Sequence, residues 1–257
     1  MAVPGNKVPD GAPAGLADTE LFAVDAYLRE FDSPVLEVDA EGRRVALART
    51  AFYPGGGGQP PDLGALTWGD GSNTVVRVRR ENGRIWHWLA GDELPDPGAE
   101  VHGELDWSRR HLLMRTHTAL HILCGVIWSE FRIPVTGGNM EPGKGRLDFP
   151  FESMSTELGQ RVESRVNEEI ERARDILVTF LGRSVADEDP ALIRTSANLI
   201  PKEIDPLRVI DIVGLDRQAD GGTHVASTAD VGRIAVTGTE SKGKGNKRIR
   251  LEVRDRD

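Results

Sequence analysis

Two histidines four residues apart, His117 and His121 in the segment HTALH, are the first residues of this sequence that could do chemistry. On a helix, side chains at positions i and i+4 project from one face, with Cβ atoms roughly 5–6 Å apart. Their imidazole nitrogens could then reach one metal ion at about 2.0–2.1 Å. The plainer interpretation is a pair of histidines satisfied by hydrogen bonds inside a packed helix. The surrounding residues are strongly apolar, so buried imidazoles would need partners there, which favours a metal site.

A second segment, DGGTH, also carries two potential ligands four residues apart, Asp220 and His224. His224 would supply a third nitrogen. Asp220 could ligate the metal through an oxygen, or it could orient a histidine by accepting a hydrogen bond. If it does not ligate, three histidines leave one coordination position open. The two glycines allow the backbone to turn tightly beside a ligand, although a tight turn alone would also explain them.

Four consecutive glycines stand in YPGGGGQ, which runs from Tyr53 to Gln59. Such a run is too flexible to be selected for stability alone. It is not a Walker loop, because no Gly-Lys-Ser/Thr follows it.

The elements that would position these residues change in character near Trp107. Before it, segment 34–50 predicts two strands joined at Glu41-Gly42, and segment 73–91 predicts a hairpin that turns at Asn82-Gly83. A loop and another short strand follow over 92–107. These patterns indicate a small β-rich module of the barrel type.

After Trp107 the pattern becomes mixed. Residues 108–131 predict a long, largely buried helix with Ser108 as its capping residue. GRLDFPFE predicts a strand, as do segments 207–213 and 247–253. Segment 155–177 predicts an amphipathic helix with one apolar stripe. The stripe consists of Leu158, Val162, Val166, Ile170 and Ala173.

The fold class expected from this order is α+β, with an N-terminal β-rich, barrel-like domain followed by an α/β two-layer domain. We expect residues 1–17, which are rich in Pro, Gly and Ala, to form a disordered tail. The β-rich domain with the glycine-rich loop would cover 18–106. The domain with the candidate metal ligands would cover 107–257.

Composition bounds the class of protein. The 257 residues are 39% hydrophobic and 28% charged, as in ordinary globular domains. The single cysteine excludes an internal disulfide and indicates a reducing compartment, which we take to be the cytoplasm. No apolar run approaches the roughly 20 residues that span a bilayer, so no membrane is expected. The net charge of −9 argues against a protein that coats nucleic acid nonspecifically.

Two basic clusters remain, and solvated loop charge explains either of them most simply. The first is RRHLLMR, with Arg109, Arg110 and Arg115, and the second is SKGKGNKRIR near the C-terminus.

The segments RTHTALH and GGTHVAST, in this order, resemble the editing domain of alanyl-tRNA synthetase and most closely its free-standing relatives, the AlaX-type editing proteins. RTAFYPGGGGQPPDLGAL is similar to the glycine-rich motif of that family, and VTGGNMEPGKGRLDF to the segment after its histidine helix. The resemblance implies a second domain of the type common to threonyl- and alanyl-tRNA synthetases. It also implies hydrolysis of the ester that joins a mischarged amino acid, chiefly serine with glycine as a second candidate, to tRNA for alanine.

Site roles follow from the same resemblance. It implies one zinc ion per chain, held by His117, His121 and His224 with residue 220, where this sequence has Asp220 and the family has a cysteine. Gly55 stands where members often have glutamate, and we assign it no role. The resemblance implies two residues in the catalytic site, Thr136 and Gln59. The Thr136 hydroxyl would form a hydrogen bond with the serine hydroxyl of the substrate. For substrate contacts it implies Gly56, Gly57, Gly58, Arg146 and Thr223. Arg146 and the C-terminal lysines are candidates for holding phosphate, and either could equally be surface charge.

Other functions stay open at this point. A metallopeptidase would carry HExxH with glutamate as general base, but Thr118 follows His117 here. A non-catalytic RNA-binding module would keep the basic loops without needing the three histidines together. A metal-dependent hydrolase of another substrate would share the same ligands. Nothing in the sequence sets the oligomeric state.

Overall fold

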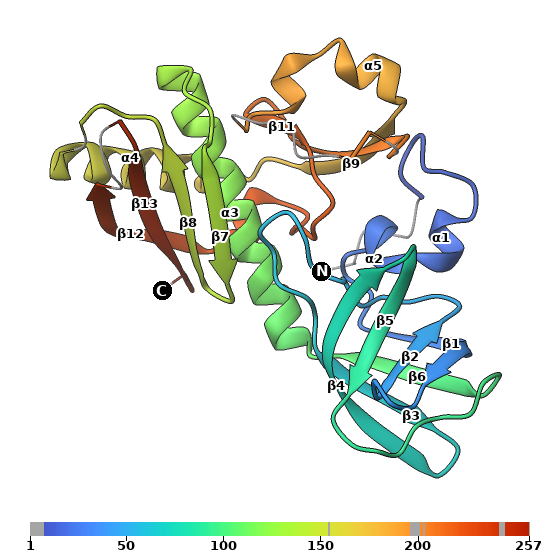
Figure 1. Ribbon diagram of the computed structural model, residues 1–257. Helices are drawn as coiled ribbons and strands as arrows, with labels where there is room; N and C mark the ends of the chain where they lie inside the picture. The colour runs from blue at the N-terminus through green and yellow to red at the C-terminus, as the bar shows by residue number, and fades with distance from the viewer. Residues whose placement is uncertain (1–7, 154, 196–200, 203, 242–244, 257) are drawn as a thin grey trace. The chain divides into compact units, whose positions relative to one another are not determined.

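The computed structural model describes residues 8–153, 155–195, 201–202, 204–241 and 245–256. The chain forms two compact units, Met1–His111 and Leu112–Asp257 (Figure 1). None of the helices in these described ranges combines the length and apolar character needed to cross a membrane. The α+β class predicted from the sequence is confirmed.

The first unit is built on a closed barrel of six antiparallel strands in the order β1-β2-β5-β4-β3-β6. Short helices α1 (Leu16–Thr19) and α2 (Leu21–Val24) precede it. The strands are β1 (Glu30–Asp39), β2 (Arg44–Leu47), β3 (Gly64–Trp68), β4 (Gly71–Glu81), β5 (Arg84–Leu89) and β6 (Glu100–Leu105). Apolar side chains such as Val45, Leu66 and Val75 fill the interior and are fully buried.

The predicted hairpins have the expected turns. Asn82 and Gly83 join β4 to β5 with φ angles of 50° and 77°, which is the backbone that a two-residue type I′ turn requires. β1 and β2 also pair as expected. Strand β3 was not predicted, because its short sequence GALTW carries little pattern of its own and pairs with β4 and β6.

The N-terminal stretch that we expected to be a disordered tail is only partly described. Residues 1–7 lie outside the described residues. Further on, Ala12 N donates to Pro9 O at 3.2 Å, and Leu16 N donates to Pro13 O at 3.1 Å. The described segment before α1 therefore contains hydrogen-bonded turns.

Arg110, expected to be solvated, is instead fully buried. Its guanidinium donates to the carboxylate of Asp62 at 2.5–3.0 Å and to the carbonyls of Ala26 and Ala51. Asp62 in turn accepts from Tyr53 N at 2.6 Å. This ion pair fixes the backbone on both sides of the glycine-rich loop. The prediction was wrong because Asp62, the partner of Arg110, lies 48 residues away in the chain and is brought to it only by folding.

The second unit combines a long helix with two sheets. Helices α3 (Trp107–Phe131) and α4 (Thr156–Glu171) cover one face of a four-stranded sheet, β12-β13-β8-β7 (Figure 1). These strands are β7 (Gly137–Glu141), β8 (Lys144–Phe149), β12 (Arg233–Ser241) and β13 (Lys247–Arg254). The predicted two-layer arrangement is confirmed.

A three-stranded sheet, β11-β10-β9, completes this unit with short helical segments. Its strands are β9 (Ile176–Leu181), β10 (Leu207–Ile212) and β11 (Asp216–Ala219). The short helices are α5 (Arg183–Asp187), η1 (Pro190–Leu192) and η2 (Thr228–Val231).

Two helix ends differ from the sequence prediction. Asp106, not Ser108, caps α3, because its Oδ1 accepts from Arg109 N at 3.1 Å. Helix α4 ends at Glu171 rather than continuing to residue 177. Ala173 has a φ of 51°, which breaks the helix, and Ile176 starts a strand that pairs with β10. Ile176 and Leu177, which the apolar pattern placed in the helix, therefore belong to a strand.

We expect Arg110→Met to lower the free energy of unfolding by about 3–5 kcal/mol, because it leaves the Asp62 carboxylate buried without a counter-charge. Urea unfolding followed by tryptophan fluorescence measures this, since Trp68, Trp86, Trp88 and Trp107 belong to the first unit. Arg109→Met is the matched control, because its guanidinium donates only to the carbonyl of Pro61 among its described contacts. Equal losses in both variants would contradict the assignment.

His87 makes the barrel sensitive to acid. Its ring is fully buried between Thr50 Oγ1, 2.9 Å away, and Val45 O, 3.2 Å away, and burial lowers its pKa to about 4. The unfolded chain therefore binds the extra proton first as the pH falls. The stabilisation is complete above pH 6.5 and is lost as the pH falls towards 4.

In the unaltered protein we expect the free energy of unfolding to fall by an amount on the order of 1–3 kcal/mol between pH 6.5 and 4 because of His87. The variant His87→Gln should flatten this acid dependence. Unfolding free energies measured at a series of pH values test this. The half-buried His102 gives the control variant His102→Gln, which should keep the steep dependence. Parallel profiles for the unaltered protein and His87→Gln would overturn the assignment.

Candidate metal centre

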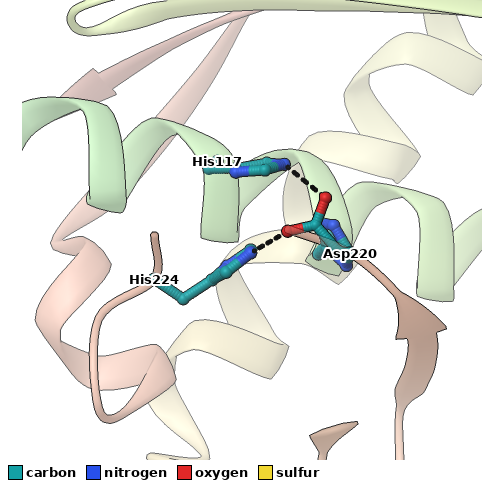
Figure 2. A group of neighbouring side chains, drawn as sticks. His117, Asp220 and His224 are labelled. Carbon is teal, nitrogen blue, oxygen red and sulfur yellow. Dashed lines mark hydrogen bonds and ion pairs between the residues drawn. The ribbon is translucent and has the colours of Figure 1, made fainter. Parts of the chain in front are cut away.

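Four side chains from two distant segments converge in the second unit. His117 and His121 come from α3. Asp220 and His224 follow β11, and Figure 2 shows them beside His117. One ligand atom from each residue lies within 4.8 Å of the others, a grouping that could hold a metal ion. The three imidazole rings have centroids 4.3–5.1 Å apart. All three histidines are buried, so the cluster is largely shielded from water.

The Asp220 carboxylate lies between two of the rings. Oδ1 is 3.6 Å from His117 Nε2, and Oδ2 is 3.1 Å from His224 Nε2 (Figure 2). The local backbone sets this position, because Gly222 N donates to Asp220 Oδ2 at 2.7 Å. Arg208 on β10 donates to the carbonyls of Asp220 and Gly222 at 3.0 and 2.8 Å. The turn is therefore fixed from both sides.

Polar side chains contact the outer nitrogens of two rings. Asp216 Oδ2 is 3.0 Å from His121 Nδ1, and Thr118 Oγ1 is 3.1 Å from His224 Nδ1. Because each Nδ1 is engaged from outside, the Nε2 atom is the one available to a metal.

The pKa shifts of His117, His224 and Asp220 suit metal binding, and that of His121 opposes it. Burial lowers the pKa of His117 well below its usual value and that of His224 to about 4, so both rings are neutral near pH 7. Burial would raise the pKa of Asp220, but the adjacent His117 and the hydrogen bond with His224 outweigh it and hold that pKa well below the usual range. Burial also acts to lower the pKa of His121, but its hydrogen bond with Asp216 raises it overall. Neutral imidazoles and an ionised carboxylate are the forms that bind a metal.

Comparison with known proteins places this site in a family. Residues 207–250 match the family model described as "Threonyl and Alanyl tRNA synthetase second additional domain", a range that includes Asp220 and His224. The alanyl-tRNA editing protein AlaX-M of Saccharolobus solfataricus is 37% identical over 237 residues, covering 91% of this chain and 98% of that protein. The protein of the same name from Methanosarcina mazei is 34% identical over 242 residues, covering 91% and 96%. The chain belongs to the AlaX-M family of alanyl-tRNA editing proteins.

An alanine–tRNA ligase is also similar. That of Pyrobaculum neutrophilum is 34% identical over 251 residues, which are 93% of this chain but 28% of the ligase. These similarities confirm the family inferred from the sequence motifs. They also confirm the prediction of an editing enzyme, a deacylase that acts on aminoacyl-tRNA.

Other residues that the resemblance implied lie in different places. Thr223 is fully buried between Gly222 and His224. Thr136 precedes β7, is exposed, and donates from Oγ1 to Asn246 Oδ1 at 3.1 Å. Arg146 on β8 contacts Asp148, with Nη1 3.2 Å from Oδ2. Of the C-terminal lysines, those at 242 and 244 lie outside the described residues.

Gln59 and the loop glycines belong to the first unit, where the loop is a tight turn. Gly56 N donates to Gln59 O at 3.0 Å, and Gln59 N donates back to Gly56 O at 2.9 Å. Gly55 to Gly58 all have positive φ angles, between 57° and 134°, which explains the run of glycines. Gln59 itself is buried.

Residues that the sequence analysis missed surround the cluster. The sequence alone did not indicate Asp216, Arg208 or Arg194, and for Thr118 it showed only that a glutamate is absent there. Asp216 stands four residues before Asp220, so the spacing of acids before DGGTH was a usable signal. Arg194 and Arg208 gave no signal, because their contacts depend on tertiary packing.

We expect Asp220→Cys to preserve or tighten zinc binding, because a thiolate would replace the carboxylate among the same imidazoles. Asp220→Ala should weaken binding, because the carboxylate lies between two ring nitrogens. Competition with a chromophoric chelator measures both affinities. Zinc affinity of Asp220→Ala equal to that of the unaltered protein would show that the three histidines suffice.

Proposed function

We propose that the protein hydrolyses mischarged tRNA for alanine, chiefly Ser-tRNA and secondarily Gly-tRNA, with one zinc ion held by His117, His121, Asp220 and His224. The observation that carries the proposal is the convergence of these four donors in a chain that matches AlaX-M proteins almost end to end. The proposal places the protein in the cytoplasm, where its tRNA partner is used in translation.

The donor set fits zinc. Three imidazole nitrogens and one carboxylate oxygen are ordinary zinc ligands, and a fourfold set is the common coordination number. The oxygen of Asp220 is harder than a thiolate, so preference for zinc over other divalent ions is weaker than in a site with cysteine. A bound zinc ion would supply a Lewis acid for the ester carbonyl or an acidified water.

The chain's own residues hold the reacting groups in position and form a buried surrounding. An aminoacyl ester is already activated, so the site has chiefly to position a water molecule and stabilise the developing oxyanion. The buried histidines and the fully buried Thr223 provide that surrounding. In this proposal Gln59 and the glycines at 56–58 contact the substrate, and Arg146 holds a phosphate near the acceptor end.

Thr136 supplies the discrimination between serine and alanine in this proposal. Its hydroxyl proton is directed to Asn246 Oδ1, so the lone pairs of Oγ1 are left to accept a hydrogen bond from the serine hydroxyl. A site that hydrogen-bonds a substrate hydroxyl rejects an analogue without it far better than an apolar pocket does. Alanine, which has no hydroxyl, would therefore be spared.

A deacylation assay with Ser-, Gly- and Ala-charged tRNA for alanine tests the proposed function. We expect hydrolysis of Ser-tRNA, slower hydrolysis of Gly-tRNA and little of Ala-tRNA. Removal of metal by a chelator should abolish the activity, and zinc should restore it. Rapid hydrolysis of Ala-tRNA, or full activity after verified metal removal, would contradict the proposal.

We expect Thr136→Val to slow Ser-tRNA hydrolysis roughly two- to tenfold, the effect of losing one neutral hydrogen bond of about 0.5–1.5 kcal/mol. Gly-tRNA hydrolysis should change much less, because glycine offers no hydroxyl. Thr136→Ser keeps the hydroxyl and is the matched control. Equal losses on both substrates would mean that Thr136 supports the fold instead.

A further inference from the structure

The Asp216 carboxylate beside His121 is completely buried and is surrounded by hydrogen-bond donors. Arg194 Nη1 donates to Oδ1 at 2.5 Å, and Gln218 Nε2 donates to Oδ2 at 2.7 Å. His121 Nδ1 lies 3.0 Å from the same Oδ2. A carboxylate can only accept, so the contact with His121 requires a proton on Nδ1 of the ring.

Arg194 is itself held in place. Its Nε donates to Ala191 O at 3.2 Å, and its guanidinium lies 5.3 Å from the ring centroid of Trp128. Trp128 is on α3, two helical turns beyond His121, so the same helix carries the metal ligand and the ring against which Arg194 packs. A guanidinium has only hydrogen-bond donors, so the atom of residue 216 that faces Arg194 must be an acceptor, that is, an oxygen.

We propose that Arg194 is a positioning residue for the metal centre: it fixes Asp216, which holds the Nδ1 proton of His121 so that the Nε2 lone pair is directed at the metal. This inference rests on the proposed metal site, and it adds two residues that act through His121. Hydrogen bonds of this kind set both the tautomer and the ring orientation of ligating histidines, and their loss typically weakens metal binding about 10- to 100-fold.

The substitution Asp216→Asn tests the direction of the hydrogen bond. An asparagine keeps the shape of the side chain but has one oxygen and one NH₂ group. Its oxygen must face Arg194, because the opposite orientation would set NH₂ against a guanidinium, which cannot accept. The amide of Gln218, which contacts the other position, can turn to present its own oxygen to the NH₂ group. The NH₂ group then faces His121 Nδ1 and donates to it, which moves the ring proton to Nε2. That tautomer has no lone pair for the metal.

Removal of Arg194 should then rescue the asparagine. In Arg194→Met/Asp216→Asn, the amide is free to turn its oxygen to His121, which restores the proton to Nδ1. We expect zinc affinity, measured by chelator competition, to fall about 10- to 100-fold in Asp216→Asn and to recover most of that loss in the double variant. A merely structural role would make the double variant worse, not better.

Asp211→Asn is the matched control. Asp211 lies on β10 opposite Arg217 of β11, so the variant removes the same charge from the neighbouring strand and should leave zinc affinity unchanged. Absence of zinc binding in the unaltered protein would refute the proposed metal function itself. Zinc binding in the unaltered protein with undiminished affinity in Asp216→Asn, or no recovery in the double variant, would overturn only the role of Arg194 and Asp216.

A spectroscopic measurement needs no variant. In the metal-free unaltered protein at about pH 9, where imidazole is neutral, nitrogen-15 NMR of the histidine rings reports the tautomer directly. We expect His121 to carry its proton on Nδ1. A proton on Nε2 would overturn the proposal even if Asp216→Asn failed to fold.

Discussion

Three imidazoles and a carboxylate can stay close together in a buried place only if every polar atom around them has a partner, because an unpaired buried polar group costs several kcal/mol. The second unit meets this condition with side chains from separate elements. Asp216 and Thr118 contact two outer ring nitrogens, and Arg208 holds the carbonyls of the turn. Within the described part of the chain, no buried side-chain nitrogen or oxygen lacks a hydrogen-bond partner.

Helix α3 is the element on which this arrangement depends. It has 25 residues and is largely buried, so its i, i+4 spacing directs His117 and His121 to one point with little freedom. The partner segment reaches that point through the pairing of β10 with β11 and the turn that follows. Thr118 and His224, which lie 106 residues apart in the chain, are in direct contact. The site is therefore an outcome of tertiary folding around one helix.

The sequence was most informative where local spacing decides geometry. Two pairs of potential ligands at four-residue spacing were enough to predict a cluster that the structure brings together, and Asn82-Gly83 was enough for its hairpin turn. It was least informative where distant segments decide. The end of α4 was misplaced because the strand that begins at Ile176 pairs with β10, and Arg110 was taken as solvated although Asp62 receives it in the interior. Arg194 was missed for the same reason, since only the folded chain brings it to Asp216.

The proposed editing chemistry depends on one zinc ion held jointly by His117, His121, Asp220 and His224. X-ray absorption at the zinc edge of the purified protein tests it most directly, because nitrogen and oxygen ligands at about 2.0–2.1 Å are distinguished from sulfur at about 2.3 Å. We expect one zinc ion with a shell of nitrogen and oxygen ligands, an imidazole signature and no sulfur. A sulfur ligand would contradict it, because the chain's single cysteine, Cys124, is outside the cluster. A zinc ion bound without imidazole would contradict it equally.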